Sequence, residues 1–349
     1  MSVDTQAPPV APPVAPSPTV TSPAVPSPTA PPPGGTPPPP KRPRGGRPPR
    51  VPKPPRRAPR PPKRYEPLTP QTVLVRGLLS VAAALLLAFG LNITVLSHVQ
   101  HLVSQQLLGN EFRALLADGT APVSEGDFDD VLLPDGAPVA IVDIPVIGVH
   151  EVVVEGTSSD VLKGGPGHRR DTVLPGQRGI SVLMGRASAY GGPFSRLQEL
   201  APGDTFTVRT GQGKQVFEVI GVRYAGDPTP KAPTAKESRI MLETARGAAF
   251  APTGVAYVDA RLRGDVQDAG LRQTTFTSLP PEDRAMATDT TTAWALVFAL
   301  QFLVVVQVAA VWAYNRLGAQ KTWVVFVPVG LLAVLYVTNQ LTLLLPNLL

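Results

Sequence analysis

Three apolar runs in the chain are each long enough to cross a membrane as a helix. The first covers residues 73–97, and its centre, 77–96, carries only three polar side chains. The other two cover 293–314 and 323–345. An α-helix rises about 1.5 Å per residue, so about 20 residues span a hydrocarbon layer of about 30 Å. The pattern therefore predicts three transmembrane helices.

Between the first and second apolar runs, the hydrophobic pattern changes to short β-branched segments separated by Gly and Pro. The expected strands lie within 138–145, 146–154, 180–184, 204–210, 214–223, 239–243 and 255–262. Gly211 to Gly213 is a hairpin turn between two of them. Several short strands of this kind are typical of a barrel. We expect a mainly β domain over 138–264, folded as one closed or nearly closed β-barrel.

The segments that flank this domain have other compositions. Residues 98–137 predict a helical stalk that extends the first span and continues into an acidic linker, and 265–290 predict a second linker. Residues 1–70 hold 27 of the 43 prolines. Such a composition cannot bury enough apolar surface to offset the entropy of ordering, so we expect a disordered tail.

Positive charge predicts the orientation in the membrane. Eleven Lys and Arg residues and no acid lie between Lys41 and Arg64, and Arg316 and Lys321 lie in the turn between the last two spans. Because Lys and Arg are retained on the cytoplasmic side, the N-terminus is expected inside, with residues 98–290 and the C-terminus outside. The long basic stretch before the first span favours an uncleaved anchor over a signal peptide.

The same basic stretch limits the expected partners. The net charge of +6 is concentrated in the tail rather than spread over a folded surface, so nucleic acid is not expected. Three roles of this tail remain open: an orientation signal, attraction to anionic membrane lipid, and docking of a Pro-rich segment to a cytoplasmic partner.

An ordered series of short motifs runs through the β region. They are Ile144-Pro145-Val146-Ile147-Gly148-Val149, Val154-Glu155-Gly156-Thr157, Gly165-Pro166-Gly167-His168, Leu174-Pro175-Gly176, Val182-Leu183-Met184-Gly185, Gly191-Gly192-Pro193-Phe194 and Leu200-Ala201-Pro202-Gly203-Asp204. In this order they resemble the sortase family, class E-like and of actinobacterial type. The resemblance covers only the β region. It implies a sortase-like closed barrel, held by a membrane anchor, at a Gram-positive cell envelope.

Sortases are transpeptidases that use a cysteine thiolate, a histidine and an arginine, and this chain departs from that pattern. The family's T-L-x-T-C motif is matched by Met241-Leu242-Glu243-Thr244-Ala245, so Ala245 stands at the nucleophile position. Arg186 stands at the histidine position, and Val255 aligns with the arginine. The 349 residues contain no cysteine, so we expect no thiol transpeptidation and no catalytic residue of the family's kind.

Three side chains near this degenerate site are candidates for binding instead. Arg186 could pair with a carboxylate or phosphate in the former peptide groove, although a surface arginine at the barrel mouth is the simpler expectation. Thr244 and His168 are possible groove residues, with a structural role expected for His168. Ser188 or Thr244 would act as a nucleophile only with a base in reach, and His150 and His168 are not placed by the resemblance to supply one.

No cofactor or metal is expected. The acidic positions Glu125, Asp127, Asp129 and Asp130 lack the spacing of a full calcium loop and are interpreted as a solvated linker.

Polar and small residues in the spans suggest contacts between helices. Small residues four apart, Ser80, Ala84, Ala88 and Asn92, form one face of the first span. Amides are costly in lipid unless they are hydrogen-bonded. Packing among the three helices or a membrane partner would satisfy Gln301, Gln307, Asn339 and Gln340.

The function that follows from the sequence is non-enzymatic. We expect a membrane-anchored, sortase-like pseudoenzyme that acts outside the cytoplasm as a scaffold or as a module for a peptide or an envelope protein. The alternative is a hydrolase that reuses the barrel with non-cysteine chemistry.

Overall fold

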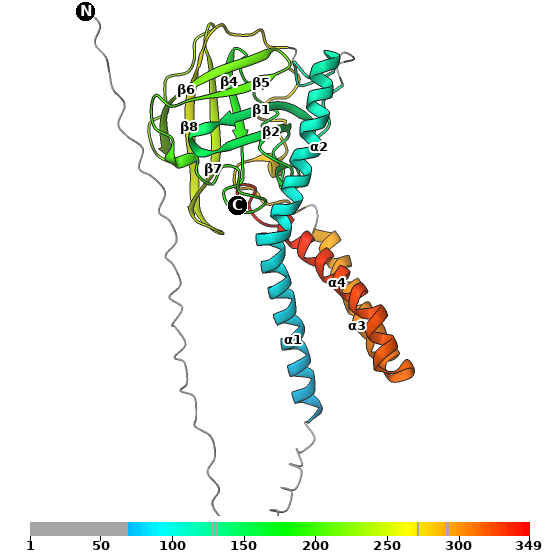
Figure 1. Cartoon of the computed structure of the whole chain (residues 1–349). Coiled ribbons are helices and arrows are strands. Elements are labelled where there is room, and N and C mark those ends of the chain that lie inside the picture. Colours follow the sequence, from blue (N-terminus) through cyan, green and yellow to red (C-terminus); the bar gives the residue numbers. More distant parts are fainter. Residues whose placement is uncertain (1–68, 128, 130, 271, 291–292) are drawn as a thin grey trace, which may run out of the picture. The chain divides into compact units, whose positions relative to one another are not determined.

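The computed structural model describes residues 69–349 except 128, 130, 271 and 291–292 (Figure 1). The expectation of a disordered tail over 1–70 lies almost entirely outside these residues.

A long continuous helix opens the described chain. It comprises α1 (Pro70–Leu91), a π-helical segment η1 (Asn92–Leu96) and α2 (Ser97–Asp118). Pro70 suits the first turn because its missing N–H would have no partner within the helix. The helix stops at Gly119, whose φ of 69° is the left-handed conformation that glycine adopts at helix ends.

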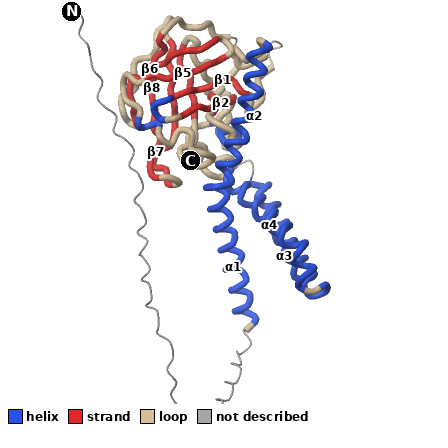
Figure 2. The backbone as a smooth tube through the Cα atoms, in the orientation of Figure 1, coloured by secondary structure: helices blue, strands red, loops and turns tan. Residues whose placement is uncertain are grey.

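The second half of this helix covers the predicted helical stalk and packs on the barrel. Gln105 Oε1 accepts a hydrogen bond of 2.7 Å from Val152 N, and its Nε2 donates to Gly164 O at 2.8 Å. His101 Nε2 lies 3.1 Å from the Glu151 carboxylate. Figure 2 shows α2 beside β1 and β2.

Eight strands close into a barrel in the order β1-β2-β3-β4-β7-β8-β6-β5. Their bounds are β1 Pro138–Ile144, β2 Val149–Glu155, β3 Gly167–His168, β4 Gly179–Met184, β5 Thr205–Thr210, β6 Gly213–Tyr224, β7 Ser238–Ala248 and β8 Ala251–Arg263. The pairs β2–β3 and β4–β7 are parallel, and the other pairs are antiparallel. The predicted hairpin is confirmed by the pairing of Thr210 with Gly213. The two-residue strand β3 was missed because it is too short to show an alternating pattern.

The barrel is held together by its inward-facing side chains. Alternate residues of a strand point to opposite faces, so Ile240 and Leu242 of β7 and Val258 of β8 enter one apolar core. Phe206 and Phe217 stack across β5 and β6 with ring centroids 5.7 Å apart. Burial of a core side chain of this size stabilises the fold by roughly 1.5–3 kcal/mol.

Short 3-10 segments join the strands and the last helices. They are η2 Pro145–Ile147, η3 Val161–Lys163, η4 Leu197–Glu199 and η5 Pro281–Asp283. The acidic segment before β1 is not simply a solvated linker, because Glu125 is buried and its Oε1 accepts a hydrogen bond from Thr274 N. That part of the sequence-based interpretation is wrong.

Two apolar helices, α3 (Ala293–Leu317) and α4 (Ala319–Leu343), close the chain. With the first helix, they make three helices among the described residues that are long and apolar enough to cross a membrane. Leu303 and Val337 belong to one apolar cluster of these helices, against which Leu85 of α1 packs. The predicted fold class, a closed β-barrel with three apolar helices, is confirmed.

Close packing around β3 gives a test of the barrel's closure. A Cβ on Gly167 would lie 2.1 Å from Gly156 O, a backbone atom, whereas a Cβ on Gly254 in β8 would meet nothing within 4 Å. We predict that Gly167→Ala destabilises the chain by about 1–3 kcal/mol. Gly254→Ala is the matched control and should have little effect. Since Trp294, Trp312 and Trp323 all lie in α3 and α4, far-ultraviolet circular dichroism during heating is the suitable readout. Equal midpoints for the two variants would contradict the close approach.

Candidate functional site

The two strand positions matched to the sortase nucleophile and arginine lie directly opposite each other. Ala245 of β7 pairs with Val255 of β8 in the antiparallel ladder. Leu242 of β7 faces the barrel core, so Ala245, three residues on, faces outward, on the same side as Met241. These positions form part of an outward-facing apolar patch between the strands.

Arg186 lies just beyond β4 and is completely buried. Its Nη2 donates to Ser159 O at 2.7 Å and Ser159 Oγ at 2.9 Å, and the guanidinium lies 5.1 Å from the ring centre of Tyr190. Burial lowers the pKa of Arg186 to about 10, an effect opposed by Tyr190 and Asp160. The expectation of a surface arginine is therefore wrong, because this side chain is packed beneath the loop that follows β4.

The same arginine has spare hydrogen-bonding capacity. Its Nε and Nη1 have no hydrogen-bond partner among the residues that the structure describes. A buried donor without a partner costs stability. Arg186 thus fixes the Ser159 loop through only part of its guanidinium.

The last residues of the described chain cover the patch at Ala245. Leu348 is fully buried and packs in a cluster with Leu162, Val182, Met184 and Ala245. Its carbonyl accepts a hydrogen bond of 2.9 Å from Ala187 N. Sequence reasoning missed this contact, because nothing in an apolar run that ends a membrane helix indicates that it turns back to a barrel.

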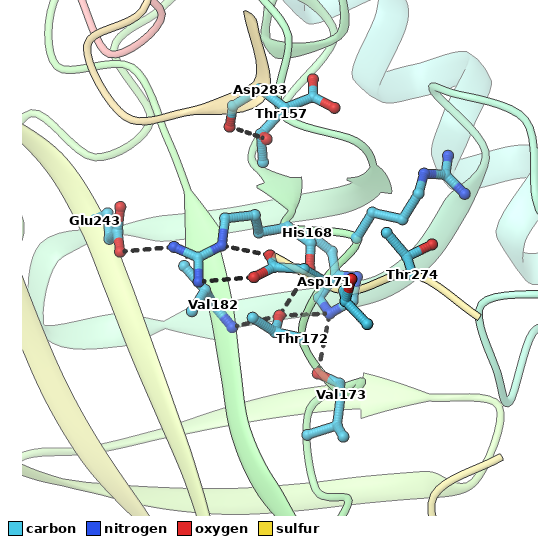
Figure 3. Close-up of polar contacts among 12 residues, drawn as sticks. Thr157, His168, Asp171, Thr172, Val173, Val182, Glu243, Thr274 and Asp283 are labelled. Carbon is cyan, nitrogen blue, oxygen red and sulfur yellow. Dashed lines mark hydrogen bonds and ion pairs between the residues drawn. The ribbon is translucent and has the colours of Figure 1, made fainter. Parts of the chain in front are cut away.

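A buried polar network borders the apolar patch on the same outer face. Arg169 Nε lies 2.6 Å from Asp171 Oδ1, and its Nη1 lies 3.7 Å from Glu243 Oε1; Figure 3 shows Asp171 and Glu243. Next to them, Arg223 Nε lies 2.6 Å from Asp259 Oδ2. Opposite charges thus lie beside one another along the outer face of β7 and β8.

Burial controls the ionisation of Glu243. It raises the pKa of this carboxyl to about 7, against the opposing effect of Arg169 and Arg223. The sequence signal was the outward position of Glu243, two residues before Ala245, in a strand otherwise rich in apolar residues.

His168 has a structural role in the described fold. It is buried, its Nδ1 lies 2.9 Å from Glu155 Oε2, and its Nε2 lies 2.9 Å from Val173 O (Figure 3). Both ring nitrogens lie next to acceptors within the domain, so neither is available to bind a peptide ligand. The hypothesis that His168 binds in the groove is wrong, and the structural role expected for it is the one observed.

Thr244 also points away from the outward-facing patch at Ala245. It follows Leu242 by two residues, so its side chain faces the barrel interior, opposite to Ala245, and it is fully buried. The prediction that Thr244 is a groove residue is therefore wrong, and its hydroxyl is not accessible as a nucleophile.

Ser188 lies beside the patch, and in the described part of the chain its hydroxyl makes no hydrogen bond to a histidine. Its Oγ accepts a hydrogen bond of 3.3 Å from Phe250 N. His168 is held by Glu155, and His150 Nδ1 lies 3.5 Å from Asp143 at the surface. A serine nucleophile needs a base within hydrogen-bond reach, and neither histidine is placed to act as one.

The described part of the chain offers no group of three or more His, Asp or Glu side chains that could hold a metal ion. The chemistry available on the outer face is therefore apolar packing around Ala245, backbone hydrogen bonding from the loop after β4, and a charge-paired border.

Comparison with known proteins finds similar sequences and structures. A family model for the sortase domain matches residues 142–250. The closed barrel that contains these residues is of sortase type, and it is termed the sortase domain from here on. Sortase D of Bacillus subtilis (strain 168) is 33% identical over 85 residues, which are 24% of this chain and 41% of that protein. The chain thus spans less than half the length of this curated relative.

Solved structures of sortases are also similar. A sortase D5 transpeptidase of Clostridium perfringens is 21% identical, with a TM-score of 0.38, and the match covers 46% of this chain and 99% of that one. Sortase E1 of Streptomyces coelicolor, solved with a tripeptide in its active site, is 21% identical, with a TM-score of 0.33, over 38% of this chain and 91% of that one. The predicted resemblance to sortases is confirmed, while the class E-like assignment stays a prediction.

The raised pKa of Glu243 predicts a pH dependence of stability for the sortase domain. An unfolded glutamate has a pKa of about 4.3, so between about pH 4.3 and 7 the folded state holds a proton that the unfolded state releases. Stability should therefore fall as pH rises through this window. Glu243→Gln should flatten the slope and raise stability at pH 8, by on the order of 4 kcal/mol at most.

The measurement is the melting midpoint of the full chain from pH 5 to pH 8. Asp283, whose pKa burial raises to about 6, adds a slope of the same sign that remains in the variant. Glu218→Gln is the control, because hydrogen bonds from Arg263 and Arg261 lower that pKa to about 2 and leave it ionised throughout. A slope unchanged by Glu243→Gln would show that this carboxyl titrates outside the window.

The pair of His168 and Glu155 gives a second prediction. His168→Ala should destabilise the domain by about 3–5 kcal/mol, because it removes the hydrogen-bonded partner of the fully buried Glu155 and leaves only Arg170, at 4.0 Å, as an ion-pair partner. His150→Ala removes a histidine from an exposed pair and should cost less than about 1 kcal/mol. Both variants are compared with the parent chain by thermal unfolding. Similar losses for the two would rule out a special structural role for His168.

Proposed function

We propose that this chain is a membrane-anchored sortase-family protein without transpeptidase activity, which uses the outer face of β7 and β8 to bind a peptide segment. Binding, not bond cleavage, is the function that this site supports best.

The surroundings of Ala245 carry the proposal. A methyl group stands at the nucleophile position, Val255 faces it across the ladder, and Leu348 packs on it. Acyl transfer needs a nucleophile and a group that stabilises the developing oxyanion. At these positions the chain instead offers apolar contact, which favours a bound side chain over a reacting one.

The cellular setting belongs to the same proposal. The charge pattern that surrounds the three apolar helices favours a cytoplasmic N-terminus and a sortase domain outside the membrane of a Gram-positive envelope. Membrane lipid covers the exposed faces of α1, α3 and α4. The amides of Gln301, Gln307, Asn339 and Gln340 are proposed contacts for other helices, within the chain or in a membrane partner.

Turnover by the full chain in detergent micelles tests the absence of catalysis. The chain is incubated with peptides from digested envelope proteins and with hydroxylamine as acceptor, and hydroxamate products are sought by mass spectrometry. A cysteine-containing sortase D is the positive control. We expect no product above the background without enzyme.

The same samples test the hydrolase alternative through a fluorophosphonate probe that labels activated serines. The chain should remain unlabelled. Labelling that Ser188→Ala abolishes, or peptide cleavage lost in that variant, would replace the binding function with a hydrolytic one.

A further inference from the structure

Residues 346–349 contact the site in the manner of a bound peptide. Asn347, Leu348 and Leu349 are all buried. The carbonyl of Leu349 accepts hydrogen bonds from Ala189 N at 2.9 Å and Ser188 N at 3.3 Å. The loop after β4 thus donates main-chain N–H groups to this segment, and Leu348 O receives another from Ala187 N.

Asn347 supplies the polar part of the contact. Its backbone N donates to Ala287 O at 2.9 Å, and its Nδ2 donates to Arg284 O at 3.1 Å and also to Glu282 O. Asn347 fits this place because its short side chain ends in an NH2 group, which can donate to both carbonyls. Aspartate at this position would instead place a carboxylate against acceptors.

Leu348 supplies the apolar anchor. It is fully buried between Met184 of β4 and Ala245 of β7, and Ala285 and Met286 also pack against this cluster. The small side chain at position 245 leaves room for the leucine. A β-branched or aromatic residue there would meet Leu348, since overpacking of a filled site forces its neighbours to move.

Main-chain hydrogen bonds combined with a pocket for one side chain are a general mode of peptide recognition. We infer that residues 346–349 are an intramolecular ligand of the sortase domain. The surface that they cover, here termed the groove, is formed by Met184, Ala245 and the loop 187–189, and it accepts short segments with an amide side chain followed by leucine. This inference rests on the proposed binding function, and it names both the ligand class and the resting occupant of the site.

A single engineered cysteine reports whether the groove is covered. The 349 residues contain none, so Ala245→Cys gives the full chain one thiol, which a water-soluble maleimide can label. Ala245 is only 5% exposed beneath Leu348, so labelling should be at least tenfold slower than at Ser195→Cys on the exposed surface.

Displacing the segment should then expose this thiol. Leu348→Asp combined with Ala245→Cys should raise the labelling rate at least tenfold, because a carboxylate disfavours the apolar pocket. Val146→Asp combined with Ala245→Cys is the matched control, since Val146 is an exposed valine on the barrel. Circular dichroism establishes that each variant is folded.

A peptide added in trans tests recognition separately from coverage. An amidated Leu-Leu-Pro-Asn-Leu-Leu peptide should slow labelling of the Leu348→Asp, Ala245→Cys chain in a saturable way. The same peptide with Ala in place of Asn should need at least a fivefold higher concentration, and a scrambled peptide should not protect.

The outcomes separate the inference from the proposed function. Labelling of Ala245→Cys as fast as Ser195→Cys, or a slow rate that Leu348→Asp leaves unchanged, would overturn the intramolecular ligand. Peptide protection in those cases would still support binding at the groove. Exposure of the thiol without protection by the peptide would show that the segment packs there only as part of the fold, and would also overturn the inference.

Discussion

The arrangement of the molecule depends on the loop between β4 and η4, where the barrel meets the helices. Tyr190 adopts a left-handed conformation with φ of 52° and is buried. Its N donates to Ser97 Oγ at 3.3 Å, at the start of α2, and its hydroxyl lies 3.0 Å from Thr342 Oγ1, near the end of α4. One residue therefore joins the first and last helices to the sortase domain, and the strain of its backbone is compensated by these bonds.

This constraint explains why the positions matched in sequence to the sortase histidine and nucleophile, Arg186 and Ala245, are so deeply covered. Arg186 opens the loop and holds Ser159, and the next residues donate their N–H groups to Leu348 and Leu349. A loop that carries a reacting histidine must leave that side chain accessible to substrate. Here the loop serves as an anchoring surface, and the arginine at its start is buried beneath it.

Much of the fold was predictable from the sequence, whereas the site was predictable only in part. Alternation in β7 and β8 and the run lengths of α3 and α4 are local properties, and they predicted the barrel and the apolar helices correctly. Local alternation in β7 also indicates that Thr244 faces inward. Thr244 was a candidate only because it matches a position of the family motif. The burial of Arg186 and Glu125 depends on segments that are distant in sequence, namely the loop at Ser159 and the irregular segment at Thr274. No local pattern therefore indicates it.

The contact of residues 346–349 has a further mechanical consequence. The segment that leads into α3 contributes the carbonyls of Arg284 and Ala287, and the segment that leaves α4 contributes Asn347, which binds both. Thr157 of the barrel in turn donates from Oγ1 to Asp283 O at 2.6 Å. The two ends of the α3–α4 hairpin are thus fastened to each other and to the barrel through one set of hydrogen bonds. A peptide that replaced Asn347 and Leu348 in the groove would release one end of the hairpin, so occupancy of the groove and the attachment of the two helices are thermodynamically linked.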